Sequence, residues 1–210
     1  MKILEPLKLN RGLLIVFEGI DGTGKSTQCS MLTEHLNKIG IASISLAEPT
    51  RGKWGMKIRQ LLTEGRKGIS PEEELTWFIN DRKEDVELNI NPALKEGKVV
   101  LMDRYYFSTA AYQGALGFDP KEIREDNEKF APVPDRVLIF HNSPDKSLER
   151  IESSREGKSV FEKRDYLIDV QNIFKSFTGA NIRFISSDAS LEDVHAQVLC
   201  EVQDLFELKL

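Results

Sequence analysis

The chain has 210 residues, of which 40% are hydrophobic and 30% are charged, and its formal net charge is −5. These values are typical of one ordinary globular domain with a sizeable core. The negative charge argues against a broad nucleic-acid or membrane surface, because both kinds of surface need a basic face. The sequence also lacks an apolar run long enough for a signal peptide or a membrane span. We therefore expect a cytoplasmic protein without nucleic-acid or membrane partners, with a short extension at 1–11 and one domain at 12–210.

The first predicted strand, at 13–17, leads directly into the strongest motif of the sequence. In FEGIDGTGKSTQ, residues 17–28, two glycines, a lysine and a serine fit the pattern G-x-x-x-x-G-K-[ST]. In such a loop, backbone N–H groups surround the β-phosphate of a nucleotide, the lysine bridges the β- and γ-phosphates, and the hydroxyl binds Mg²⁺. The helix that follows presents its N-terminus to the anion. The predicted phosphate-binding residues are Gly19, Ile20, Asp21, Gly22, Thr23, Gly24, Lys25, Ser26 and Thr27.

The rest of the chain alternates between predicted helices and strands. The first helix starts within the loop and ends at Gly40, a plausible C-cap. Further strands are predicted at 42–46, 98–102, 136–140 and 182–185. Further helices are predicted at 54–64, 71–96, 107–115, 144–154, 161–177 and 191–207. Ser70 is a good N-cap for the helix at 71–96, because a proline and three acids follow it. This alternation predicts an α/β fold with a parallel sheet, and such sheets bind ligands at the carboxyl ends of their strands.

The segments at those strand ends carry further motifs. AEPTRG follows the second strand, DRYYFSTAAYQG follows the third, and LTWFINDRKEDV lies between them. Together with the phosphate-binding loop, this ordered set resembles the thymidylate kinase family over roughly residues 13–194. A GTPase fits less well, because Asn37 and Lys38 are not followed by the remaining residues of the guanine-binding pattern.

The resemblance implies a P-loop NTPase-like three-layer sandwich with a five-stranded parallel sheet flanked by helices. It also implies an enzyme, usually a homodimer, that uses ATP and Mg²⁺ to convert dTMP to dTDP in dTTP synthesis. ATP and dTMP are therefore the expected partners. Two alternatives stay open. One is a P-loop kinase that acts on another nucleoside, nucleotide or small acceptor, and the other is a nucleotide-binding regulator without catalysis.

Four residues are expected to act on the phosphates and the metal. Lys25 should stabilise charge on the transferring phosphoryl group, while Ser26 and Asp103 should bind Mg²⁺. Arg104 follows Asp103, and its planar guanidinium can bind phosphate through two nitrogens. The ordinary alternative for Asp103 and Arg104 is a surface ion pair, which the buried strand before them disfavours.

By the same resemblance, a second group of residues binds the acceptor. Asp21 would contact the 3′-OH of the sugar, and Gln113 would offer its amide to the base. Phe78 and Arg82 lie four residues apart on one helical face, so an aromatic platform for the base would stand beside a cation for its monophosphate. Such a pair is otherwise a core residue with a surface arginine. The predicted acceptor-binding set is Asp21, Glu48, Arg51, Phe78, Arg82, Arg104 and Gln113.

Arg51 enters this set for a different reason from the others. Many relatives have an arginine directly before the Glu–Pro pair, whereas this chain has Ala47 there, and Arg51 could supply the missing charge.

Two later segments also match the family. Residues 150–164 resemble the mobile lid of nucleoside monophosphate kinases, and Arg155 is the expected catalytic cation, ahead of Arg164. The ordinary alternative for the lid segment is a solvated face. The segment SSDASLEDV resembles the adenine-side loop, through Asp188 and Ala189, although ordinary helix capping explains this segment equally well.

Overall fold

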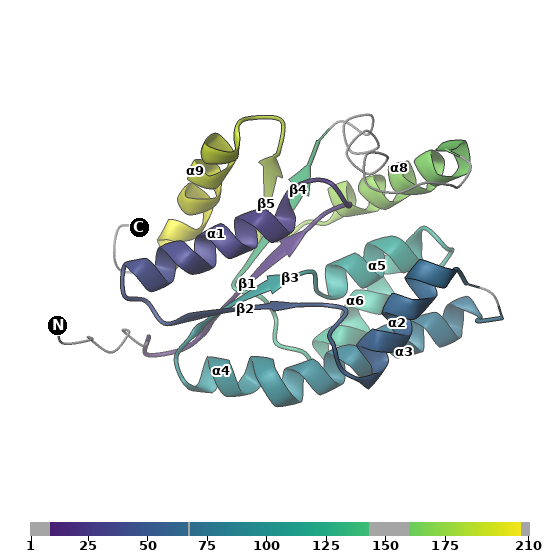
Figure 1. Cartoon of the computed structure of the whole chain (residues 1–210), viewed down its shortest axis with the longest axis horizontal. Helices are drawn as coiled ribbons and strands as arrows, with labels where there is room; N and C mark the ends of the chain where they lie inside the picture. Colours follow the sequence, from purple (N-terminus) through teal and green to yellow (C-terminus); the bar gives the residue numbers. More distant parts are fainter. Residues whose placement is uncertain (1–8, 67, 143–159, 207–210) are drawn as a thin grey trace.

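A five-stranded parallel sheet forms the centre of the protein (Figure 1). The computed structural model describes residues 9–66, 68–142 and 160–206. In spatial order the strands are β2-β3-β1-β4-β5, and every pair of neighbours is parallel. Their bounds are β1 Leu13–Glu18, β2 Ser43–Ala47, β3 Val99–Asp103, β4 Arg136–His141 and β5 Ile182–Ser186.

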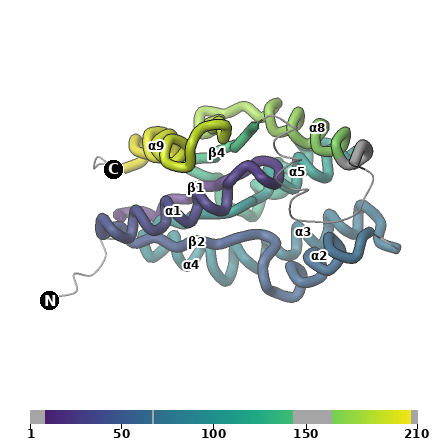
Figure 2. Tube along the Cα trace, turned by 45° about the horizontal axis from the view of Figure 1, so that its top comes forward, coloured from purple at the N-terminus to yellow at the C-terminus, as the bar shows by residue number. Residues whose placement is uncertain are grey.

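Helices cover both faces of the sheet, as Figures 1 and 2 show. Two of them, α1 Lys25–Lys38 and α9 Leu191–Val202, pack on one face. The opposite face is covered by α3 Pro71–Asp85, the π-helical segment η1 Val86–Ile90, α4 Asn91–Lys95, α5 Tyr106–Gly114, α6 Pro120–Glu128 and α8 Val160–Ser176. The helix α2 Lys53–Glu64 packs on α3, and the short segment η2 Gln203–Leu205 follows α9.

The side chains of β1 explain the three layers. Leu14 and Val16 point into the core under α5, whereas Leu13, Ile15 and Phe17 point into the core under α1 and α9. Both sets are buried, because a parallel sheet between two helical layers has no solvated face. The predicted α/β three-layer sandwich is thus confirmed. Among the described residues, no helix is both long and apolar enough to cross a bilayer.

The elements follow the sequence prediction with two differences, and one further predicted helix is not tested. The predicted helix at 71–96 is interrupted by the π-helical η1, although the Ser70 cap is confirmed, since its hydroxyl accepts the Glu73 N–H at 3.2 Å. The helix α6 was not predicted, although Asp119 caps it and Pro120 occupies its first position, which are both start signals. The predicted helix at 144–154 lies outside the described residues.

The carboxyl ends of the central strands meet at one level of the sheet. Asp103 at the end of β3 pairs in register with Phe17 of β1 and Ala47 of β2. Directly after β1, Gly19 has a φ of +130°, and a Cβ there would lie 2.3 Å from the carbonyl oxygen of Phe140 on β4. Only glycine fits this contact, because the neighbouring atom is backbone and cannot move aside.

We expect Gly19→Ala to destabilise the fold more than a glycine substitution that meets only a conformational cost. Gly40 is the matched control, because its φ is +86° and no atom lies within 4 Å of the position that a Cβ would occupy there. Gly40→Ala should lower the free energy of unfolding by roughly 1 kcal/mol, and Gly19→Ala by about 3 kcal/mol or more. Urea denaturation measures both values. Equal losses in the two variants would contradict the steric account.

Candidate active site

The loop between β1 and α1 has the backbone of an anion-binding site. Gly22 and Gly24 have φ values of 79° and 86°, and Gly24 is the N-cap of α1. Turns of this kind direct successive N–H groups toward one concave point, next to the positive end of the helix dipole. The Thr23 hydroxyl closes the loop by donating to the carbonyl of Ile20 at 2.8 Å. The predicted phosphate-binding residues are therefore brought together in one turn.

Lys25 lies within this loop and is buried. Its Nζ donates to the Ile20 carbonyl at 2.7 Å. Burial, together with the positive charge of Arg104, lowers the pKa of Lys25 to about 7, although Asp21, Asp103 and Glu18 act in the opposite direction. A bound polyphosphate would add negative charge and favour the charged lysine.

Ser26 and Asp103 face each other across the gap between α1 and β3. The Ser26 hydroxyl donates to Oδ2 of Asp103, while Oδ1 of Asp103 is buried and has no hydrogen-bond partner among the described residues. Hydroxyl and carboxylate oxygens are hard ligands, and Mg²⁺ in phosphate-transfer sites takes one or two protein oxygens together with the substrate phosphates. This donor set, with an unpaired buried oxygen, fits Mg²⁺.

Arg104 connects the phosphate loop to the neighbouring helix α5. It has a φ of +73°, an unfavourable value for a residue with a side chain, and its N–H donates to the Phe17 carbonyl at 3.0 Å. Its guanidinium donates to Ser108 Oγ at 2.8 Å and to the Gly19 carbonyl at 3.2 Å, and it pairs with Asp21 at 2.5 Å. The side chain is thereby directed back over the loop.

Glu18 organises this junction, although the sequence analysis did not single it out. Its buried carboxylate accepts the backbone N–H groups of Tyr105 at 2.8 Å and Ser108 at 3.2 Å, and it also accepts the Ser108 hydroxyl. These bonds satisfy the N–H of the N-cap residue Tyr105 and one first-turn N–H of α5, whose N-cap residue makes no side-chain capping bond. Burial raises the pKa of Glu18 to about 7, against the hydrogen bond from Ser108 and the charge of Arg104. The sequence did offer one signal for Glu18, because it is an acidic residue at the end of a buried apolar strand.

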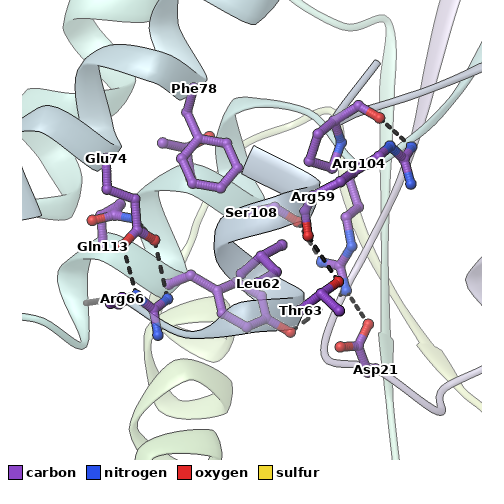
Figure 3. Close-up of a pocket in the computed structure, with 13 residues that line it drawn as sticks. Asp21, Arg59, Leu62, Thr63, Arg66, Glu74, Phe78, Arg104, Ser108 and Gln113 are labelled. Carbon is purple, nitrogen blue, oxygen red and sulfur yellow. Dashed lines mark hydrogen bonds and ion pairs between the residues drawn. The ribbon is translucent and has the colours of Figure 1, made fainter. Parts of the chain in front are cut away.

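A cavity of about 300 Å³ opens beside Arg104 (Figure 3). Its walls come from the loops after β1, β2, β3 and α2 and from the helices α2, α3 and α5. The lining residues are Asp21, Pro49, Arg59, Leu62, Thr63, Arg66, Glu74, Phe78, Arg104, Ser108, Thr109, Tyr112 and Gln113. Four of the predicted acceptor residues are among them: Asp21, Phe78, Arg104 and Gln113. Arg59, Arg66 and Glu74 also line the cavity and were not predicted.

Three other predicted acceptor residues are not part of this lining. Arg82 is buried, where it pairs with Glu48 and donates to Asn127 at 2.8 Å and to Thr109 at 3.1 Å. Burial raises the pKa of Glu48 to about 8, although Arg82 opposes the shift. Since Thr109 lines the cavity, the Glu48–Arg82 pair lies directly behind its wall. Arg51 is exposed in the loop after β2. The acceptor-binding roles of Glu48, Arg51 and Arg82 stay predictions.

The remaining predicted residues lie in the loop before α9, on α8 or outside the described residues. Asp188 and Ala189 are exposed in the loop between β5 and α9. Gln28 on α1 donates to the Leu191 carbonyl at 3.0 Å, which holds this loop near the helix after the phosphate loop. Arg164 lies on α8, whereas Arg155 and most of the predicted lid at 150–164 lie outside the described residues.

The parallel sheet, the phosphate loop and the adjoining cavity define a protein of the P-loop NTPase fold. A family model described as thymidylate kinase matches residues 17–198. A thymidylate kinase of Desulfotalea psychrophila is 46% identical over 95% of this chain and 98% of its own, and one of Akkermansia muciniphila is 45% identical over 90% of each. The crystal structure of thymidylate kinase from Ehrlichia chaffeensis superimposes with a TM-score of 0.73 at 27% identity, covering 92% of this chain and all of its own. The chain therefore belongs to the thymidylate kinase family, and the resemblance read from the motifs is confirmed.

The raised pKa of Glu18 has a consequence for stability. An unfolded glutamate titrates near 4.5 and the folded Glu18 near 7, so between these values the folded state binds more protons. The contribution of Glu18 to the free energy of unfolding therefore decreases as the pH rises through this interval. Between pH 5 and pH 8, we expect the stability of the parent to fall by roughly 2–3 kcal/mol relative to Glu18→Gln.

Urea denaturation of both proteins at the two pH values measures this difference. Glu34→Gln is the matched control, because Glu34 is an exposed glutamate on α1, and this variant should follow the parent at both pH values. If Glu18→Gln also follows the parent at both pH values, the buried carboxyl does not titrate in this interval and the account is wrong.

Proposed function

We propose that this protein is an ATP-dependent nucleoside monophosphate kinase that phosphorylates dTMP to dTDP, a step of dTTP synthesis. One observation carries the proposal: Asp21 of the phosphate loop and Arg104, which binds that loop through the Gly19 carbonyl and Asp21, both line the cavity. A nucleotide in the loop and a second ligand in the cavity would therefore meet at these two side chains. Membership of the thymidylate kinase family supports dTMP as that second ligand.

On the donor side, the loop residues 19–27 would bind the phosphates of ATP, and Lys25 would stabilise the charge on the γ-phosphoryl group. Ser26 and Asp103 would hold Mg²⁺, which supplies charge neutralisation for the phosphates when it is bound. The exposed Asp188 and Ala189, next to the start of α9, are the proposed adenine side of the site. The buried, unpaired oxygen of Asp103 supports the metal assignment.

On the acceptor side, Phe78 would stack on the base, Gln113 would bond its edge, and Asp21 would bond the sugar hydroxyl. Arg104 would bind the acceptor phosphate, because it already projects between the loop and the cavity. An oxygen of that phosphate is anionic at neutral pH, so it can attack the γ-phosphorus without a general base. One P–O bond to dTMP forms as the bond to the β-phosphate oxygen breaks, and ADP leaves.

The other predicted residues take supporting roles in this proposal. Glu48 and Arg82 would hold the wall behind Thr109, while Arg51 would add charge at the rim. We also propose a cytoplasmic homodimer, for which the family resemblance is the support. A second acceptor, such as another nucleoside monophosphate, is not favoured by any contact of the described residues.

An ADP-release assay across nucleoside monophosphates tests the acceptor. We expect activity with dTMP, less with dUMP, and little with dCMP, dGMP or AMP. Discrimination against a purine would come mainly from the size of the pocket, and cytosine would leave polar groups unpaired, which costs more than a missing methyl group. Preference for a purine monophosphate, or ADP release that depends on none of these acceptors, would contradict the proposal.

Replacing the loop lysine tests the donor assignment. Lys25→Met should keep the fold but lower kcat by about a hundredfold or more, because a buried charge that stabilises the transition state is lost. Lys38→Met is the matched control, since Lys38 is an exposed lysine on the same helix, and its kcat should stay near that of the parent. A folded Lys25→Met protein with near-normal turnover would overturn the assignment.

A further inference from the structure

Three polar residues form a hydrogen-bonded chain in the wall of the cavity. Arg66 binds Glu74 through two nitrogens, Nε to Oε2 at 2.6 Å and Nη2 to Oε1 at 3.0 Å. Gln113 then donates from Nε2 to Oε1 of Glu74 at 2.9 Å. Figure 3 shows Arg66 and Glu74 joined in this way, with Gln113 beside them. Glu74 and Gln113 are buried, whereas Arg66 is partly exposed.

The chemistry of the chain fixes which end of the Gln113 amide faces Glu74. An ionised carboxylate only accepts hydrogen bonds, and a guanidinium only donates them. The carboxylate of Glu74 accepts two N–H groups of Arg66, so the group of Gln113 that faces Glu74 must be the NH₂. An amide alone could turn over and present either a donor or an acceptor at nearly the same shape. Here the ion pair removes that freedom.

The other end of the amide is therefore a fixed acceptor. Oε1 of Gln113 is buried and has no hydrogen-bond partner among the described residues. A buried acceptor left unpaired is costly, by an amount comparable to a lost hydrogen bond. Because Gln113 lines the cavity, a ligand there can supply the missing donor.

We propose that the Arg66–Glu74 ion pair is a specificity device, which locks Gln113 as an acceptor and so selects bases whose ring nitrogen carries a hydrogen. This inference rests on the proposed function, and it adds Arg66 and Glu74 as positioning residues. Thymine and uracil carry a hydrogen on N3 and can donate it to Oε1. Cytosine has a bare acceptor at N3, so two acceptors would face each other. The ion pair would distinguish thymine and uracil from cytosine, but it would not distinguish thymine from uracil, which differ only in the methyl group.

Glu74→Gln tests the inference. In this variant two amides would face each other and could pair in either orientation, so Gln113 could then also present its NH₂, which suits cytosine. Glu73→Gln is the matched control, because Glu73 is an exposed neighbour on the same helix. Isothermal titration of each protein with dTMP and with dCMP measures binding without turnover. We expect the ratio of dTMP to dCMP affinity to fall by about tenfold or more in Glu74→Gln and to stay unchanged in Glu73→Gln.

A second variant keeps the test decisive if Glu74→Gln does not fold. Arg66→Met removes the guanidinium that holds the Glu74 carboxyl group in place through two hydrogen bonds, so Gln113 is no longer held in one orientation. The dTMP to dCMP ratio should then fall in the same direction. If the variants that fold keep the parental ratio, the ion pair only joins the segment after α2 to α3 and the inference is overturned, while the proposed function stands. If the parent itself does not bind dTMP, the proposed function fails and this inference fails with it.

Discussion

The buried carboxylate of Glu18 is the contact on which the rest of the site depends. It ends β1, the strand that leads into the phosphate loop, and it accepts N–H groups of Tyr105 and Ser108 at the start of α5. Four of the cavity's lining residues lie on α5: Ser108, Thr109, Tyr112 and Gln113. One carboxylate therefore sets the position of the acceptor cavity relative to the donor loop. Ser108 links Glu18 to Arg104, because its hydroxyl donates to Glu18 while its oxygen accepts from Arg104.

Charges in the site are arranged before any ligand is bound. Lys25 is buried with a lowered pKa, and Glu18 is buried with a raised one, so each group carries a desolvation cost in the ligand-free protein. Arg104 is held by Asp21, whose side chain is largely exposed and close to the loop. Groups fixed in this way need little rearrangement when negative charge arrives, and such preorganisation is the main source of catalysis in phosphoryl transfer.

The sequence was sufficient for the strands, the phosphate loop and the family. These features rest on local signals, namely apolar runs, glycine spacing and motifs in a fixed order. The orientation of single side chains was less predictable. Phe78 and Arg82 share one helical face, yet only Phe78 lines the cavity, because partners from the loop after β2, α5 and α6 bury the arginine. Arg66 and Glu74 were not found, since their pairing depends on how the segment after α2 packs on α3. The π-helical turn η1 has no simple sequence signal either.

The central claim is that ATP in the loop transfers its γ-phosphoryl group directly to dTMP in the cavity, at the point where Asp21 and Arg104 meet. The most direct measurement is ³¹P NMR of ATP, Mg²⁺ and dTMP during reaction with the purified protein. The account predicts that ADP and dTDP appear in equal amounts and that no inorganic phosphate forms. Release of inorganic phosphate with dTMP unchanged would contradict it, because the phosphoryl group would then have gone to water.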